Sequence, residues 1–306
     1  MPEAKVNITI VGALAAILTV GILVGTILGR QTSQSPTAIN ITDDLGREVV
    51  ISGTPERIVS LAPSNTEILF ALGLGDKVVG VDTYSDYPPE ATQKEKVGGF
   101  STVNVEKVVS LNPDLVLATG GEQEGFVTQL EGLGITVVAL YPDNLDGILH
   151  DITLVGDIAG AKEAADALTE NLRQRIENIE SVVENVDKPK VFYVVWDEPL
   201  MTAGRGTFPD DLITLAGGTN LGAAASGDWP TYSLEMLVAE NPDVIVLAHS
   251  KSAESMGTLS GWNSLTAVQR GRVYQIDPNI SSRAGPRIVD ALENMARYIH
   301  PELFGG

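Results

Sequence analysis

The sequence predicts an α/β protein in which two lobes are joined by a long rigid helix and preceded by an N-terminal transmembrane helix. Three observations support this prediction. Residues 8–28 form an uncharged apolar run, and residues 145–186 show a helical pattern without a proline. On either side of that pattern, short apolar runs alternate with amphipathic segments, which is typical of parallel sheets covered by helices.

Composition and charge exclude several classes of function. The 306-residue chain has 20 basic and 40 acidic side chains, a formal net charge of -20. A surface of this sign repels phosphates, so we expect no nucleic acid partner. The hydrophobic fraction of 43% is sufficient for a packed core. Cysteine is absent, which excludes disulfides, thiolate catalysis and a lipid anchor on a cysteine.

The apolar run at residues 8–28 has the length of a membrane span. At about 1.5 Å per residue a helix over it would be about 30 Å long, the thickness of a bilayer's hydrocarbon core. A cleaved signal peptide is the alternative, but such peptides have a shorter run and a small-residue exit, whereas Gly29 and Arg30 follow here. We expect residues 1–30 to be an anchor and 31–38 a flexible linker.

Residues 39–144 are expected to form the first lobe. It opens with a hairpin around the turn at residues 43–46 (DDLG), because β-rich runs flank it. Short apolar runs then predict buried strands, with helical segments between them. The predicted strands cover residues 58–61, 78–81, 115–118 and 136–139.

The helical pattern at residues 145–187 is expected to connect the lobes. Apolar side chains recur three or four positions apart from Ile148 to Val183, which describes one face of an amphipathic helix. Gly156 and Gly160 are the points at which this helix could break. Residues 188–306 form the second lobe. Its predicted strands are 191–195, 244–247 and 273–276, and its closing helix is 286–298.

A sequence repeat supports two lobes of like construction. Residues 104–117 and 233–246 each contain a helix, an Asn-Pro-Asp turn and an apolar run. Glu106 and Glu235 occupy the same place in the two copies. A carboxylate in the first helical turn complements the helix dipole. On residue chemistry alone this capping role is favoured over the alternative, a matched pair of exposed carboxylates that a two-fold basic partner could bind.

Five groups of residues together resemble the cobalamin- and iron-siderophore-binding proteins of ABC importers. They are residues 43–47, 57–67, 84–89, the two Asn-Pro-Asp turns, and 283–287 (RAGPR). The resemblance covers about residues 40 to 300 and implies two Rossmann-like lobes with a ligand between them. It implies no enzymatic activity and no intrinsic cofactor. The partners it implies are a permease dimer and its ATPase subunits, reached from the extracytoplasmic side of the plasma membrane.

The resemblance also implies roles for individual residues. Glu106 and Glu235 match glutamates that dock into arginine pockets of the permease, which reverses the preference for capping. The positions that match ligand contacts are Tyr84, Phe100, Trp196, Trp229 and Arg283. Position 100 is a tryptophan in a cobalamin binder, so Phe100 is a softer match. Without the resemblance, both tryptophans could equally be core residues.

Aromatic side chains at loop positions suit a large, flat, mostly neutral ligand, which favours cobalamin or a related corrinoid. The residues at these positions are Tyr84, Tyr87, Phe100, Trp196, Trp229 and Tyr232. Haem is one alternative, with Tyr84 or Tyr87 as the axial ligand. A ferric siderophore is another; an anionic one would need basic groups such as Arg205, Arg283 and Arg287. A membrane-anchored enzyme is a distant alternative, because common nucleophile, metal and phosphate-loop motifs are missing from the sequence. No metal site is expected.

Overall fold

The computed structural model describes residues 38–249, 255 and 260–305. The expected anchor at residues 8–28 lies outside this range. Among the described residues, no helix combines the length and the hydrophobicity that a bilayer crossing requires. Residues 38 onward form one compact unit.

The N-terminal lobe is built on a parallel sheet with the strand order β5-β4-β3-β8-β9. Every residue of β3, β8 and β9 is buried, which explains why these strands read as unbroken apolar runs. The strands are β3 (Ile58–Ser60), β4 (Val78–Val81), β5 (Glu95–Lys96), β8 (Leu115–Ala118) and β9 (Val137–Ala139). The helices are α2 (Pro63–Ala71), α3 (Val105–Ser110) and α4 (Glu124–Gly132), with short 3-10 turns η1 (Gly75–Lys77), η2 (Pro89–Gln93) and η3 (Gly121–Gln123).

Two small hairpins belong to the same lobe. The predicted N-terminal hairpin is present as the antiparallel pair β1 (Ala38–Thr42) and β2 (Glu48–Ser52). Asp43 in its turn accepts a hydrogen bond from the amide of Ala139 at 3.0 Å, which ties the hairpin to the end of β9. The second hairpin, β6 (Gly98–Gly99) and β7 (Thr102–Val103), carries Phe100 in its turn.

The C-terminal lobe has a mixed sheet with the strand order β11-β10-β13-β14, and β12 also pairs with β10. In the described part of this sheet, β11 runs antiparallel to β10 and the other strand pairs are parallel. The strands are β10 (Lys190–Asp197), β11 (Leu200–Thr202), β12 (Thr219–Asn220), β13 (Val244–Leu247) and β14 (Val273–Gln275). The helices are α7 (Phe208–Leu215), α8 (Leu234–Glu240), α10 (Thr266–Gln269), α11 (Pro278–Ser281), α12 (Ile288–Ile299) and α13 (Pro301–Phe304), with 3-10 turns η4 (Leu221–Ala224) and η5 (Trp262–Ser264).

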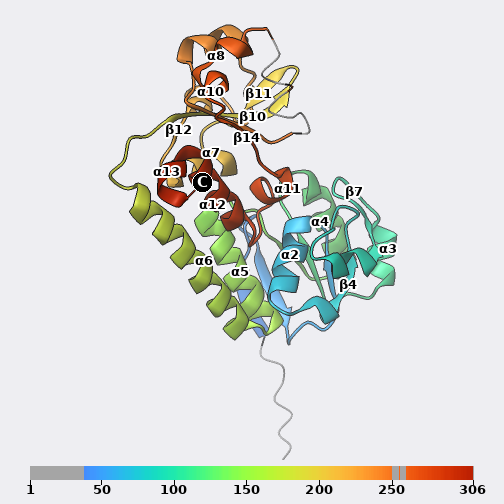
Figure 1. The fold of residues 1–306 in the computed structure, drawn as a ribbon. Coiled ribbons are helices and arrows are strands. Elements are labelled where there is room, and N and C mark those ends of the chain that lie inside the picture. The colour runs from blue at the N-terminus through green and yellow to red at the C-terminus, as the bar shows by residue number, and fades with distance from the viewer. Residues whose placement is uncertain (1–37, 250–254, 256–259, 306) are drawn as a thin grey trace, which may run out of the picture. The chain divides into compact units, whose positions relative to one another are not determined.

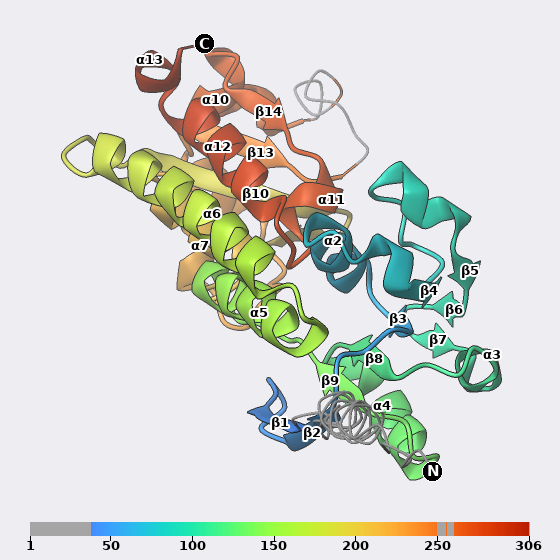
Figure 2. The ribbon, with the colours of Figure 1, turned by 90° about the horizontal axis from the view of Figure 1, so that it is seen from below.

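The connection between the lobes differs from the single long helix that the sequence pattern predicts. It is a pair of helices, α5 (Leu145–Ala159) and α6 (Lys162–Val183), which lie side by side in Figures 1 and 2. The chain reverses at Gly160, whose φ of +76° favours glycine. A Cβ atom added to Gly156 would lie 2.3 Å from that of Ala165, so a glycine there allows the two helices to approach closely.

The helix pair joins the two lobes through one continuous core. Helix α5 packs against α2 of the N-terminal lobe, and α6 packs against α7 and α12 of the C-terminal lobe (Figure 2). A single buried apolar cluster includes Leu69 of α2, Ile152 of α5, Leu172 of α6 and Leu292 of α12. Because close-packed cores deform little, this continuity limits how far one lobe can move against the other.

The two copies of the sequence repeat adopt the same local structure. Asn104 and Ser233 accept hydrogen bonds from the amides of Lys107 and Met236, and so cap α3 and α8. Asn112 and Asn241, which open the Asn-Pro-Asp turns, have φ values of 46° and 48° and are the non-glycine residues with a positive φ in the described part of the chain.

The aspartates of these turns also have equivalent roles. Asp114 accepts from the amide of Arg57 at 2.9 Å, and Asp243 accepts from the amide of Lys190 at 2.9 Å. Each aspartate therefore ties its turn to the start of a neighbouring strand, Asp114 to β3 and Asp243 to β10.

Candidate ligand-binding site

The N-terminal lobe presents Tyr84 and Phe100 at the carboxyl ends of its strands. Tyr84 follows β4 and is 60% exposed. The carbonyl of Phe100 accepts from the side chain of Gln123 at 3.0 Å, and Phe100 itself is half-buried. The Tyr84 ring would lie 3.7 Å from a Cβ atom at Gly99, beside Phe100. The two aromatic residues therefore lie on adjoining loops.

A buried polar network fixes the loop that carries Tyr84. Asp82 is 1% exposed and accepts from the amide of Tyr84 at 2.8 Å and from the hydroxyl of Ser85. Thr66 and Ser85 share a hydrogen bond of 2.7 Å, and Lys96 donates to the carbonyl of Ser85 at 2.9 Å. Burial raises the pKa of the Asp82 carboxyl above its ordinary value, against the opposing effect of these donors. The position of the loop is thus fixed by hydrogen bonds within the protein.

The C-terminal lobe presents Trp196 and Trp229 on adjacent segments. Trp196 lies near the end of β10, where it is 54% exposed and its indole donates to the carbonyl of Glu198 at 3.0 Å. Met201 of β11 is opposite Trp196 in the sheet and also bridges to Thr231. Trp229, two residues before Thr231, is 47% exposed. Both tryptophans therefore lie outside the core, as exposed side chains at one end of the sheet.

Two other aromatic residues that the sequence places on loops have different surroundings. Tyr232 is a core residue, 6% exposed, and its ring packs 5.0 Å from that of Phe192. Tyr87 lies against the guanidinium of Arg287, which is centred 3.8 Å from its ring. Apolar neighbours of the sheet bury Tyr232, and sequence position alone could not reveal them.

Arg283 links the two lobes. Its Nη1 atom donates to Glu67 at 3.1 Å and to Asp86 at 2.7 Å, both in the N-terminal lobe, and its Nη2 atom donates to the carbonyl of Tyr84 at 3.4 Å. The same Nη2 atom donates to Asn279 at 2.8 Å. The sequence places Arg283 at the rim of a ligand. In the structure it also holds the backbone of the tyrosine that we expect to contact the ligand.

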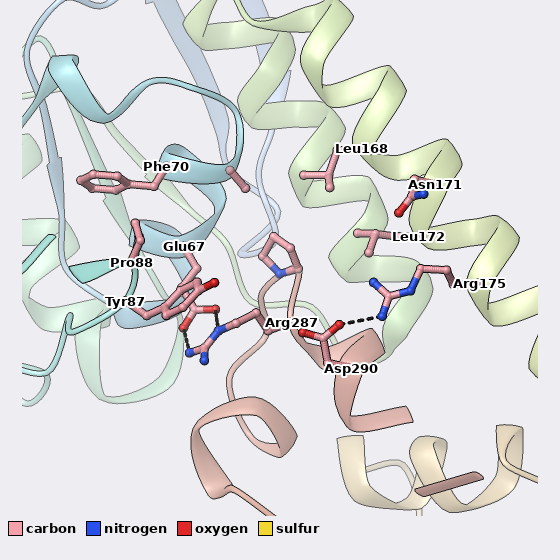
Figure 3. Close-up of a pocket in the computed structure, with 12 residues that line it drawn as sticks. Glu67, Phe70, Tyr87, Pro88, Leu168, Asn171, Leu172, Arg175, Arg287 and Asp290 are labelled. Atoms are coloured by element: carbon pink, nitrogen blue, oxygen red, sulfur yellow. Dashed lines mark hydrogen bonds and ion pairs between the residues drawn. The ribbon is translucent and has the colours of Figure 1, made fainter. Parts of the chain in front are cut away.

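Glu67 is the site residue that sequence reasoning missed. It belongs to the motif at residues 57–67, but the partners that give it a role lie more than two hundred residues further along the chain. Arg287 donates to both of its carboxylate oxygens, at 2.9 and 2.6 Å (Figure 3). The two hydrogen bonds of this pair and its burial distinguish it from a surface ion pair.

Glu106 and Glu235 are both exposed in the first turns of α3 and α8. They belong to different lobes. Tyr84 and Trp196 lie at or beyond the carboxyl ends of their strands. In the described part of the chain, no three acidic or histidine side chains gather in a way that could hold a metal ion.

Comparisons with known proteins identify the class. A family model described as periplasmic binding protein matches residues 58–280. An ABC transporter substrate-binding lipoprotein of Bacillus subtilis is 37% identical over 274 residues, which cover 87% of each chain. The vitamin B12-binding protein of Vibrio cholerae is 32% identical over 245 residues, or 80% of this chain and 89% of that protein.

Solved structures agree with this result. The crystal structure of the periplasmic vitamin B12-binding protein of Vibrio cholerae matches with a TM-score of 0.73 and 33% identity, covering 81% of this chain and 97% of that one. A periplasmic haem-binding protein of Roseiflexus matches with a TM-score of 0.72 and 27% identity, covering 81% and 99%.

This chain belongs to the periplasmic binding protein family. It is a substrate-binding component of an ABC importer and not an enzyme, and the molecule such a protein carries is transported cargo rather than an intrinsic cofactor. Substrate-binding proteins of ABC transporters work with permease and ATPase components.

Proposed function

We propose that this chain captures cobalamin or a related corrinoid on the extracytoplasmic side of the membrane and delivers it to its importer. The observation that carries the proposal is the set of exposed aromatic side chains at the strand ends of both lobes. Tyr84, Trp196 and Trp229 are each about half exposed, although large aromatic surfaces are usually buried. A flat macrocycle between the lobes would cover them, and the vitamin B12-binding relatives support this ligand.

The charges around the site favour a neutral ligand over an anionic siderophore. Arg283 and Arg287 are the arginines nearest to Tyr84 and Tyr87, and both are already paired with Glu67 or Asp86. Binding an anion with them would require these pairs to break. Of the basic groups expected for a siderophore, this leaves Arg205, which is exposed.

Haem is the second candidate, because one structural neighbour is a haem-binding protein. Tyr84 is the side chain that favours it, since its exposed phenol could serve as an axial ligand to iron. Titration of the full chain in detergent with cobalamin, cobinamide, haem and ferric siderophores, followed by calorimetry and absorbance, tests both candidates. Saturable one-to-one binding of a corrinoid supports the proposal. Binding of haem alone, with a shifted Soret band that is lost in Tyr84→Phe, would replace it.

Residues 8–28 are proposed to anchor the binding domain to the membrane. The Bacillus subtilis relative is named as a lipoprotein, but this sequence contains no cysteine to carry a lipid. A transmembrane segment would serve the same purpose by hydrophobic burial. Extraction of membranes with alkaline carbonate, with mass analysis of the retained chain, tests this. Release of a protein that begins after residue 30 would show a cleaved signal segment.

Glu106 and Glu235 are proposed to bind basic pockets of the permease, one from each lobe. Their equivalent places in the repeat and their exposure support this role. We expect the docking surface to be separate from the ligand cleft. The corresponding experiment is given in the Discussion.

A further inference from the structure

One buried carboxylate joins the two lobes. The Glu67 side chain, on α2, is 2% exposed, and both arginines that bind it belong to the C-terminal lobe. Arg287 binds it through Nε and Nη2, as the dashed lines in Figure 3 show, and Arg283 adds a third hydrogen bond. A carboxylate held by a guanidinium through two parallel bonds has a narrow range of allowed geometry, so it fixes orientation as well as distance.

The surrounding groups balance the charge and extend the contact to the ligand site. Asp86 pairs with Arg283, so two carboxylates face two guanidinium groups. Tyr87 stacks on Arg287. Asp86 and Tyr87 lie on the same loop as Tyr84, whose carbonyl accepts from Arg283. These side chains, Glu67, Asp86, Tyr87, Arg283 and Arg287, are called the Glu67 cluster below.

The cluster borders a pocket between the lobes. The pocket has a volume of about 320 Å³ and is lined by α2, α6 and the start of α12, with Glu67 and Arg287 in its wall. The aromatic residues Tyr84, Trp196 and Trp229 do not line it. On its far side, Arg175 of α6 pairs with Asp290 and Glu293 of α12, at 2.6 and 2.8 Å. Figure 3 shows the two ion-paired groups facing each other across the pocket.

Because the pocket lies between the lobes, its width would change if one lobe rotated against the other. Helix α6 is tied to α12 by Arg175, so α12 and its arginines stay with the helix pair. Helix α2 could move away from α12 only by separating Glu67 from Arg287 and Arg283. That separation would leave a buried carboxylate without partners, or require water to enter, and either change opposes the motion.

We propose that the Glu67 cluster is a latch that sets the angle between the lobes, and with it the width of the ligand cleft, before the ligand arrives. This proposal rests on the proposed function only in taking a corrinoid as the ligand of the cleft. Arg283 and Arg287 act as positioning residues, because Arg283 binds the carbonyl of Tyr84 and Arg287 stacks on Tyr87 of the same loop. If the cleft already has the width of the bound state, binding does not cost the free energy of ordering the two lobes.

The test measures the lobe angle and the affinity separately. The sequence has no cysteine, so spin labels can be placed at Leu133→Cys and Leu303→Cys, exposed positions on different lobes. We expect a narrow distance distribution in the full chain that cobalamin does not change. Glu67→Gln should broaden it and shift it to longer distances. If the correct width is then populated about a tenth of the time, the dissociation constant for cobalamin rises roughly tenfold.

Two further variants keep the test decisive. Arg287→Lys retains the charge but loses the paired hydrogen bonds and the stacking on Tyr87, so it should change the distances in the same direction by less. Glu56→Gln is the matched control, because Glu56 is an exposed carboxylate paired with Lys77 on the same lobe. It should change neither measurement.

The distance measurement needs no ligand, so it tests the latch even if the chain binds no corrinoid. If Glu67→Gln does not fold, the distance distribution of Arg287→Lys tests the proposal in its place. A folded Glu67→Gln or Arg287→Lys protein with the wild-type distance distribution overturns the proposal. The cluster would then be a packing feature without control over the lobe angle.

Discussion

Trp229 offers the sharpest test of the ligand site. Trp229 is 47% exposed. A tryptophan presents up to about 250 Å² of surface, so about 120 Å² remains for a ligand to cover, worth about 3 kcal/mol at 25 cal/mol per Å². Alanine would keep part of the contact. We therefore expect Trp229→Ala to weaken cobalamin binding by about 1–3 kcal/mol, or roughly 5- to 150-fold.

The assay is a calorimetric titration of folded Trp229→Ala, with the thermal midpoint and circular dichroism as checks on the fold. Trp229→Phe should recover much of the affinity, because a smaller aromatic face remains. Leu133→Ala is the matched control, since Leu133 is an exposed apolar side chain at the end of α4. Unchanged affinity of Trp229→Ala for every ligand of the panel would show that this tryptophan is not part of the binding site.

Two further predictions concern delivery and stability. Replacing Glu106 and Glu235 together with alanine should leave the affinity for ligand nearly unchanged and cost only the first-turn dipole interactions, about 0.5 kcal/mol each, but uptake by a reconstituted importer should fall sharply. Charge reversal of both residues to lysine should reduce uptake further. If the double alanine variant supports wild-type uptake at all concentrations of the binding protein, the two glutamates only cap their helices and the docking proposal is wrong. Asp151 of α5 is fully buried, and burial together with the nearby carboxylate of Asp44 raises its pKa to about 9. The folded protein therefore binds this proton more tightly than the unfolded chain, so the contribution of Asp151 to the free energy of unfolding should fall as the pH rises from about 4 to about 9, by at most about 1.4 kcal/mol per pH unit. Asp151→Asn should flatten this dependence in urea unfolding at pH 5, 7 and 9, whereas the exposed Asp157→Asn on the same helix should not; an equal slope in wild type and Asp151→Asn would contradict the assignment.

Elements whose causes are local could be predicted from the amino-acid sequence alone. Buried parallel strands appear as unbroken apolar runs, and β8 and β13 lie where such runs occur. Asn104 and Ser233 cap their helices as their residue types predict. The motifs at residues 43–47, 57–67 and 283–287 were sufficient to indicate the family, because several specific patterns occurred together in one order.

Features that depend on partners far apart in the sequence became visible only in the folded chain. The apolar periodicity of residues 145–186 continues through the reversal at Gly160, because α5 and α6 both turn an apolar face to the same core. Tyr232 is buried by Phe192, which a count of loop aromatic residues could not show.

Glu67 and its arginines are separated by more than two hundred residues, and only the packing of both lobes on the helix pair brings them together. Asp151 illustrates the same point. The sequence pattern gives no sign that Asp151 differs from other polar residues of the helix. Its burial depends on the elements packed around α5. Periodicity describes which face of an element is apolar, but the identity of the groups that meet there is set only when the core forms.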